Sequence, residues 1–236
     1  MNSRSIVLSF SGIDGSGKTT QIKTLLRSFV DRGASCRLYR FWDDIVVFSR
    51  HREHLSLRIL QGEKGIGSPD RPIARRDKNV TSWYLLILRL VLYLFDALRL
   101  AAIVSFRRET SDYVVFDRYI YDELANLPLH HSPIRLYAHL LLRVVPRPDV
   151  ALLLDADPET AISRKPEYPL EFVRRNRQAY LTIARIAGMT VVPPSCILET
   201  TRAIRASLEF LRPDAGATDF TKPPGFPAES AKTHAG

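Results

Sequence analysis

A glycine-rich motif near the start of the chain constrains its local structure more than any other feature. The motif G-x-x-x-x-G-K-[ST] is formed by Gly12, Gly17, Lys18 and Thr19. The apolar run Ile6–Leu8 precedes it, and apolar residues at helical spacing follow it. This order of strand, loop and helix is the context in which such a motif binds the phosphates of a nucleoside triphosphate. The alternative, a glycine-rich turn with a solvated lysine, is disfavoured by the flanking elements.

The residue types of the motif suit phosphate chemistry. Glycines let the backbone curve so that its N–H groups face phosphate oxygens, and a helix that begins at Lys18 adds its positive dipole end. We expect the Lys18 side chain to be exposed and to reach the outer phosphates, and the Thr19 hydroxyl to ligate Mg²⁺. The residues assigned to ATP are Gly12, Ile13, Asp14, Gly15, Ser16, Gly17, Lys18, Thr19 and Thr20.

Length and composition favour one large α/β domain. The chain has 236 residues, of which 45% are hydrophobic and 25% charged, as in ordinary globular proteins. Its net charge of +9 favours anionic partners, which include nucleotides as well as nucleic acids. Two cysteines are too few for a disulfide framework, so we expect a reducing, cytoplasmic location. The N-terminal residues lead directly into the first strand, and we expect no signal peptide.

Two further strands end in charged residues. Residues 36–41 alternate as in a strand, which places Arg40 near its end, and Tyr113–Phe116 form an apolar run typical of a buried parallel strand. Asp117 and Arg118 follow that run. Open α/β sheets bind ligands at the carboxyl ends of their strands, where an Asp suits Mg²⁺ and an Arg suits phosphate. A structural ion pair between Asp117 and Arg118 is the alternative.

The most apolar stretch, Trp83–Phe106, is long enough to cross a membrane. Arg89, Asp96 and Arg99 lie within it, and each charge near a bilayer centre costs about 3 kcal/mol. We therefore expect a helix packed on a protein core. Phe95 and Arg99 are four residues apart and share a helix face, where they could stack on a base and hold a phosphate. They could equally be a core phenylalanine and an amphipathic arginine.

The rest of the chain divides at its glycines and prolines. We expect helices over 133–145 and 198–211, a buried strand over 149–155, a short strand over 189–192, a helix capped by Asp157, and a longer helix that ends at Gly188. Residues 165–171 are expected to form a short lid, 62–76 a mobile loop and 213–236 a disordered tail. The fold expected for residues 1–212 is therefore a three-layer P-loop fold with a parallel five-stranded sheet flanked by helices.

Several segments together resemble the thymidylate kinases, a family of P-loop nucleoside monophosphate kinases. The loop F-S-G-I-D-G-S-G-K-T-T-Q, the Asp117–Tyr119 signature after an apolar strand, and the run from Pro148 to Arg164 are similar to those of the family. The spacing of Phe95 and Arg99 also matches. The resemblance extends over about residues 5 to 211.

The resemblance implies transfer of the γ-phosphoryl group of ATP to a nucleoside monophosphate, dTMP, with Mg²⁺. The roles that it implies are Lys18, Asp117 and Arg118 in catalysis, Thr19 and Asp117 at the metal, Arg164 at ATP, and Asp14, Arg40, Phe95, Arg99 and Arg118 at the acceptor. Small-molecule nucleotides are the expected partners, with no nucleic acid and no membrane span. A homodimer is compatible with the resemblance.

The chain also departs from the family pattern. Asp122 and Glu123 stand where small polar residues are usual, and Asn126 where an aromatic residue is usual. Residues 41–44, F-W-D-D, replace a Glu-Pro-Gly-Gly element, and the arginine-rich lid is shortened to 165–169. These departures leave open a related kinase with another acceptor or a non-catalytic nucleotide-binding regulator, and the net charge leaves open a nucleic-acid-binding ATPase.

Overall fold

The computed structural model describes residues 5–47, 83–107, 111–195 and 197–209. The loop expected at 62–76 and the tail expected at 213–236 lie outside these residues. The described residues form a sheet of five parallel strands in the order β2-β3-β1-β4-β5. The strands are β1 (Ile6–Ser11), β2 (Cys36–Arg40), β3 (Tyr113–Asp117), β4 (Val150–Leu154) and β5 (Thr190–Val192). The predicted five-stranded parallel sheet is therefore confirmed.

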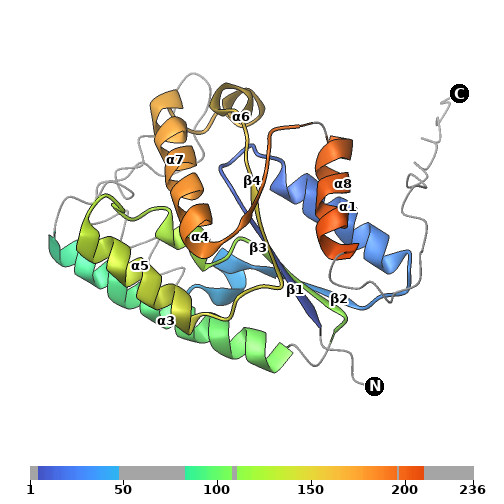
Figure 1. Ribbon diagram of the computed structural model, residues 1–236, viewed down its shortest axis with the longest axis horizontal. Coiled ribbons are helices and arrows are strands. Elements are labelled where there is room, and N and C mark those ends of the chain that lie inside the picture. The colour runs from blue at the N-terminus through green and yellow to red at the C-terminus, as the bar shows by residue number, and fades with distance from the viewer. Residues whose placement is uncertain (1–4, 48–82, 108–110, 196, 210–236) are drawn as a thin grey trace, which may run out of the picture.

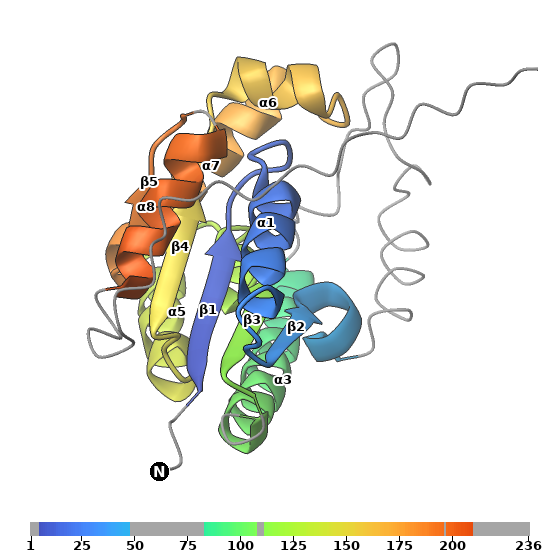
Figure 2. The ribbon, with the colours of Figure 1, turned by 90° about the vertical axis from the view of Figure 1, so that its right-hand side faces the viewer.

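Helices cover both faces of the sheet (Figures 1 and 2). On one face lie α1 (Lys18–Val30) and α8 (Ile197–Glu209). On the other lie α3 (Trp83–Arg107), α4 (Ile120–Leu124), α5 (Ser132–Val144) and α7 (Leu170–Ala187). The short α6 (Pro158–Arg164) sits at the carboxyl end of the strands, where their arrowheads point in Figure 2. These three layers are those of a P-loop fold.

The burial of the central strand, β1, on both faces of the sheet explains why strand sequences in this chain are apolar runs. All six residues of β1 are buried. Leu8 and Phe10 pack in the core on the α1 and α8 side, whereas Val7 packs in the core on the opposite side. Since both faces of the sheet are covered, alternation between apolar and polar residues is lost.

Local signals place several helix ends. The Asp157 carboxylate accepts a hydrogen bond from the Thr160 backbone N–H at 3.0 Å, and Pro158 opens α6, as predicted. Helix α7 begins at Leu170, inside the range expected for the lid, and ends before Gly188, whose φ of 66° lies in the left-handed region.

Two short elements were not predicted. Strand β2 ends at Arg40 rather than at Phe41, because residues Phe41–Ile45 turn into a single π-helical turn, η1. The Asp44 carboxylate accepts a hydrogen bond from the Arg40 N–H at 2.7 Å, and the turn buries Phe41 and Ile45 completely. The other element is α4, whose five residues are too few to show a helical period. Both elements follow the carboxyl ends of strands.

The long apolar stretch forms the single helix α3, as expected. Asp96 is fully buried against the protein, and its carboxylate accepts a hydrogen bond from the Val47 N–H at 2.6 Å. Among the helices that the structure describes, none combines the length and the apolar character that a membrane span requires.

Candidate active site

The glycine-rich loop connects β1 to α1 and packs tightly against two neighbouring elements. Gly12 and Gly15 have φ angles of 145° and 85°. A Cβ atom on Gly12 would lie 2.5 Å from the Leu154 carbonyl oxygen at the end of β4, and one on Gly15 would overlap the Ala161 carbonyl of α6. Glycine is therefore required at both positions by backbone conformation and by space. Gly15 lies outside the four motif positions, so its role became visible only in the structure.

Lys18 is buried in this loop, which corrects the expectation that its side chain is exposed. Only 6% of the residue is exposed, and its Nζ donates hydrogen bonds to the carbonyl oxygens of Gly12 at 2.8 Å and Ile13 at 2.7 Å. Burial, reinforced by the nearby Arg118 guanidinium, lowers the pKa of Lys18 to about 8. The ammonium therefore sits at the centre of the concave loop.

The end of β3 brings a second set of charged residues to the loop. Asp117 lies in register between Phe10 of β1 and Arg40 of β2. Burial raises the pKa of the Asp117 carboxyl, opposed by the charges of Arg118 and Lys18. Since Lys18 lies in the unit that continues from β1, the neighbour of β3, the two predicted catalytic groups lie at the same edge of the sheet.

Arg118 pairs with two other carboxylates. Its Nη2 donates to Asp14 of the loop, and its Nη1 lies 3.4 Å from Oδ1 of Asp122. Burial would lower the pKa of the Arg118 guanidinium, but the surroundings, chiefly Tyr180 and the Asp122 and Asp14 carboxylates, raise it above its ordinary value. Within the described residues, the ion pairs of Arg118 are therefore to Asp14 and Asp122. The alternative of an Asp117–Arg118 pair is not what the structure contains.

Asp122 lies at the centre of a buried hydrogen-bond network. Oδ2 accepts from the Ser11 hydroxyl at 2.6 Å and from the Tyr119 N–H at 3.0 Å, and Oδ1 accepts from the Tyr180 hydroxyl at 2.8 Å. Asp122 and Glu123 are 1% and 0% exposed. Neither carboxylate therefore presents an open surface to an acceptor.

The predicted acceptor residues divide into two groups. Arg40 is exposed beside Asp117, at the carboxyl edge of the sheet. Phe95 and Arg99 lie on the exposed side of α3, where Phe95 is 52% exposed. Within the described residues, no hydrogen bond or ion pair joins Arg99 to Lys18 or Arg118, and the exposed Phe95 ring is not part of the buried core. The structure thus joins Asp14, Lys18, Asp117 and Arg118, with Arg40 alongside, and leaves Phe95 and Arg99 outside this cluster.

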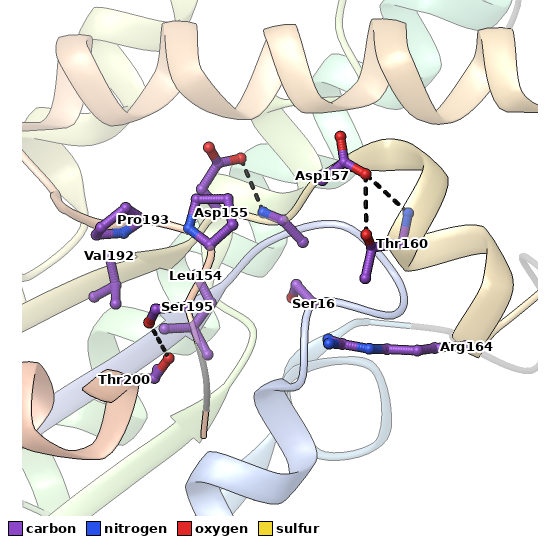
Figure 3. A pocket seen from close by; sticks show the side chains of 12 residues that line it. Ser16, Leu154, Asp155, Asp157, Thr160, Arg164, Val192, Pro193, Ser195 and Thr200 are labelled. Carbon is purple, nitrogen blue, oxygen red and sulfur yellow. Dashed lines mark hydrogen bonds between the residues drawn. The ribbon is translucent and has the colours of Figure 1, made fainter. Parts of the chain in front are cut away.

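A cavity of about 210 Å³ lies on the other side of the loop (Figure 3). Its lining comprises Ser16, Leu154, Asp155, Ala156, Asp157, Thr160, Arg164, Val192, Pro193, Pro194, Ser195 and Thr200. Figure 3 shows Arg164 extending from α6 back toward Ser16, opposite Ser195 and Thr200. The structure therefore places Arg164 at a cavity next to the phosphate loop.

The Asp155 carboxylate in the cavity wall is bound by an arginine that does not line the cavity. Asp155 accepts two hydrogen bonds from Arg177 of α7, each at 2.7 Å. A bidentate pair of this kind neutralises the carboxylate and fixes its orientation. The wall of the cavity therefore carries less negative charge than its two aspartates suggest.

Sequence reasoning missed Ser11 and Tyr180 and did not recognise the pairing role of Asp122. Arg118 and Asp122 are four residues apart, a spacing that could have indicated the pair in a helical turn. Tyr180 carries no comparable signal, because its helical spacing places it among the apolar residues of α7. Its contact with Asp122 joins residues 58 positions apart in the chain.

No protein-family model matches the chain. Three relatives named probable thymidylate kinase are similar to it. The Pyrobaculum calidifontis protein is 29% identical over 208 residues, or 78% of this chain and 86% of the relative. The Archaeoglobus fulgidus protein is 22% identical over 86% of this chain and 95% of the relative. The Sulfolobus acidocaldarius protein is 30% identical over 67% of this chain and 68% of the relative. This chain belongs to the thymidylate kinase family.

Solved thymidylate kinases share the fold. The enzyme from Ehrlichia chaffeensis superimposes with a TM-score of 0.55 at 19% identity, over 88% of this chain and 99% of that one. The enzyme from Candida albicans gives 0.58 at 18% identity, over 89% and 93%. These structures show that the chain has the P-loop fold of thymidylate kinases, as its sequence predicted. The relatives support a thymidylate kinase-like nucleotide kinase.

Proposed function

We propose that this protein transfers the γ-phosphoryl group of ATP to a nucleoside monophosphate, with dTMP as the expected acceptor. One observation supports this most strongly. At the carboxyl edge of the sheet, the phosphate loop binds the Lys18 ammonium through its carbonyls and the Arg118 guanidinium through Asp14, so one loop holds cationic groups for two phosphates. Phosphoryl transfer depends mainly on alignment and on charge neutralisation, which such a cluster supplies.

ATP is the proposed donor. The loop amides and Lys18 would hold its β- and γ-phosphates, and the cavity next to Ser16 would take its base. Arg164 would lie against the base or the phosphates. In this arrangement the γ-phosphate faces Arg118, so the acceptor phosphate enters from that side.

The residues present fit a magnesium ion bound together with ATP. Mg²⁺ prefers oxygen ligands, retains several waters, and is usually held by one or two protein groups plus phosphates. The Thr19 hydroxyl is exposed at the start of α1, and the half-buried Asp117 carboxylate lies near Lys18. These two residues would hold the ion, which would neutralise charge on the phosphates.

Arg118 would bind the acceptor phosphate through its guanidinium, a planar group suited to two phosphate oxygens. Asp14 would face the acceptor sugar, and Arg40, at the same edge, would add positive charge. Phe95 and Arg99 would contact the acceptor from α3, where their exposure leaves them accessible. A kinase of this fold with another acceptor is the second candidate, favoured by the partly exposed Asn126 at a position where the family usually carries an aromatic residue.

An ADP-release screen across nucleoside monophosphates tests this proposal. The purified protein, ATP and Mg²⁺ are combined in turn with dTMP, dUMP, dCMP, dAMP, dGMP and the ribonucleotides. We expect dTMP to give the fastest turnover. A faster response to another monophosphate would support the second candidate. ATP binding with no phosphorylated acceptor would favour a non-catalytic regulator, and stimulation of ATP hydrolysis by RNA or DNA would favour a nucleic-acid-binding ATPase.

We also propose that the protein forms a homodimer through α3. Exposed apolar side chains follow this helix at spacings of three and four residues: Tyr84, Ile87, Val91, Leu94 and Leu98. Such a stripe is typical of a helix that packs on a partner helix, and two copies related by a two-fold axis would each cover the other's stripe. Light scattering should give twice the chain mass. Val91→Glu should yield monomers, whereas Val30→Glu, at an exposed valine of α1, should not.

A cytoplasmic location, and a domain that spans residues 1–212, also remain proposals. They rest on the low cysteine content and on the periodicity of the sequence.

A further inference from the structure

We propose that Asp122 and Tyr180 are positioning residues that orient the Arg118 guanidinium, and that the acceptor phosphate replaces Asp14 as its partner. The proposal rests on the proposed phosphoryl transfer. It assigns different roles to the three side chains that surround Arg118. Asp122 and Tyr180 would keep their contacts throughout. Asp14 would exchange with the substrate.

The first argument is the number and origin of the bonds to Asp122. The carboxylate accepts from Ser11 of β1, from Tyr119 and Arg118 in the turn between β3 and α4, and from Tyr180 of α7. Three parts of the fold therefore converge on one carboxylate. Since its side chain is completely buried, these bonds are not exchanged with water and hold a fixed geometry.

The second argument is the backbone of Arg118. Its φ of 72° makes it the only described residue other than glycine with a positive φ. A long side chain adopts this conformation only when its surroundings enforce it, and such residues concentrate at functional sites. Here the Arg118 N–H donates to the Phe10 carbonyl at 2.9 Å, and the next N–H, of Tyr119, donates to Asp122 at 3.0 Å. Asp122 thus holds both the backbone and the side chain of this turn.

The third argument is the difference in exposure between the two carboxylates that pair with Arg118. The side chains of Arg118 and Asp14 are 21% and 22% exposed, whereas that of Asp122 is 0% exposed. An incoming phosphate can therefore reach the Asp14 side of the guanidinium but not the Asp122 side. When Asp14 is displaced it remains on the phosphate loop, next to the entering acceptor, where its carboxylate can accept a hydrogen bond from an acceptor hydroxyl.

The charges agree with an exchange. The cluster formed by Arg118 and its described ion-pair partners contains one cation and two carboxylates, those of Asp14 and Asp122. A phosphate that simply added to this cluster would meet an excess of negative charge. A phosphate that takes the place of Asp14 on Arg118 meets a cation whose other side is already oriented.

Two substitutions with the same change in charge test the proposal without using activity. Asp14→Asn and Asp122→Asn each remove one carboxylate near Arg118. Binding of inorganic phosphate is measured by isothermal titration calorimetry. We expect Asp14→Asn to tighten binding by up to about fivefold, because a partly exposed competing charge is removed. We expect Asp122→Asn to weaken it, because the guanidinium loses its orientation. Tighter binding in both variants would mean that only net charge matters and would overturn the proposal.

A second pair covers the case in which Asp122→Asn does not fold. Tyr180→Phe removes the hydroxyl that binds Asp122, and the matched control Tyr137→Phe removes a hydroxyl that donates to the Leu90 carbonyl at 2.6 Å, away from Arg118. Both variants lose one hydrogen bond, so we expect similar decreases in Tm. For Tyr180→Phe we expect kcat/KM for the acceptor to fall by about tenfold to a hundredfold, with the Kd for ATP unchanged.

Equal acceptor kinetics in Tyr180→Phe and Tyr137→Phe would show that the network is structural only. If no acceptor is phosphorylated by the wild-type protein, the proposed function fails, but the phosphate titrations still decide whether Asp122 orients Arg118 and whether Asp14 competes for it.

Discussion

At the scale of single residues, burial changes the meaning of the charged groups around the phosphate loop. Lys18 was expected to be exposed, and Asp122 stands where the family usually carries a small polar residue, but both are buried in the structure. Asp122 uses its oxygens on protein donors, so it organises the site rather than contacting an acceptor base. Lys18 donates to two loop carbonyls, and in the proposed function phosphates would replace them as its partners.

Replacing Lys18 with methionine should separate its catalytic role from its structural one. The lowered pKa, about 8, means that the folded protein binds this proton less tightly than the unfolded chain does, so the positive charge opposes folding at pH 7. Lys18→Met keeps the length of the side chain without the charge. We expect an unchanged or slightly higher Tm and a loss of turnover of at least about a hundredfold. Near-normal turnover in a coupled assay would contradict the assignment of the phosphate loop.

Arg118→Lys should damage the acceptor side selectively. Lysine keeps the charge but lacks the planar fork, and the loss of one charge-assisted hydrogen bond is worth about 1.5–3 kcal/mol. We therefore expect kcat/KM for the acceptor to fall about tenfold to a hundredfold, with an unchanged Kd for ATP in a separate titration. Equal weakening of ATP binding would move Arg118 to the donor side.

At the scale of elements, the strands and most helices followed from the apolar runs, the helical spacing and the capping residues of the sequence, whereas α4 and η1 did not. Strands buried on both faces and helices of thirteen or more residues leave patterns that can be counted, whereas α4 and the π-helical turn η1 have five residues each. Both short elements lie where strands end. They therefore determine where the Asp44 and Asp122 side chains point. The periodicity of the neighbouring elements does not predict these directions.

The contact between the phosphate loop and α6 gives a prediction at this scale. A Cβ on Gly15 would overlap the Ala161 backbone, whereas one on Gly33, with a similar positive φ of 69°, meets no atom within 4 Å. Gly33→Ala should therefore cost only the strain of the left-handed conformation, about 1 kcal/mol. Gly15→Ala should cost more and should also weaken ATP binding, because α6 must move away from the loop. The free energies of unfolding from urea titrations, together with ATP titrations, would measure both effects. Equal costs would show that α6 moves freely.

At the scale of the whole molecule, the sheet order brings segments that are distant in sequence to one edge. Strand β1 lies between β3 and β4, so the loop after β1 meets Asp117 and Arg118 on one side and the Asp155–Arg164 segment on the other. The proposed acceptor and donor sites therefore lie on opposite sides of one loop. This arrangement suits a kinase that must align two phosphates.

Removing residues 213–236 tests the proposed boundary of the domain. This segment is rich in proline, glycine, alanine and threonine and contains few apolar residues that could dock on the domain. We expect the shortened chain to keep its Tm within about 2 °C and its activity within about twofold, because the loss of an undocked segment leaves the core intact. A large decrease in either would show that the segment contacts the folded domain.

The sequence by itself determined the strand–loop–helix unit around Lys18, the five parallel strands and the family resemblance. These features depend on local spacing and on apolar runs in the sequence. The elements that such patterns predict are retained in the three-layer fold. Only the tertiary structure decided that Arg118 pairs with Asp14, that Lys18 and Asp122 are buried, and that Phe95 and Arg99 stay outside the charged cluster. The four-residue spacing indicates the Arg118–Asp122 pair, but the burial of Asp122 depends on contacts between elements far apart in the chain, such as Asp122 of α4 with Tyr180 of α7 and Ser11 of β1. Such contacts arise from how the layers close on one another, and no local pattern encodes them.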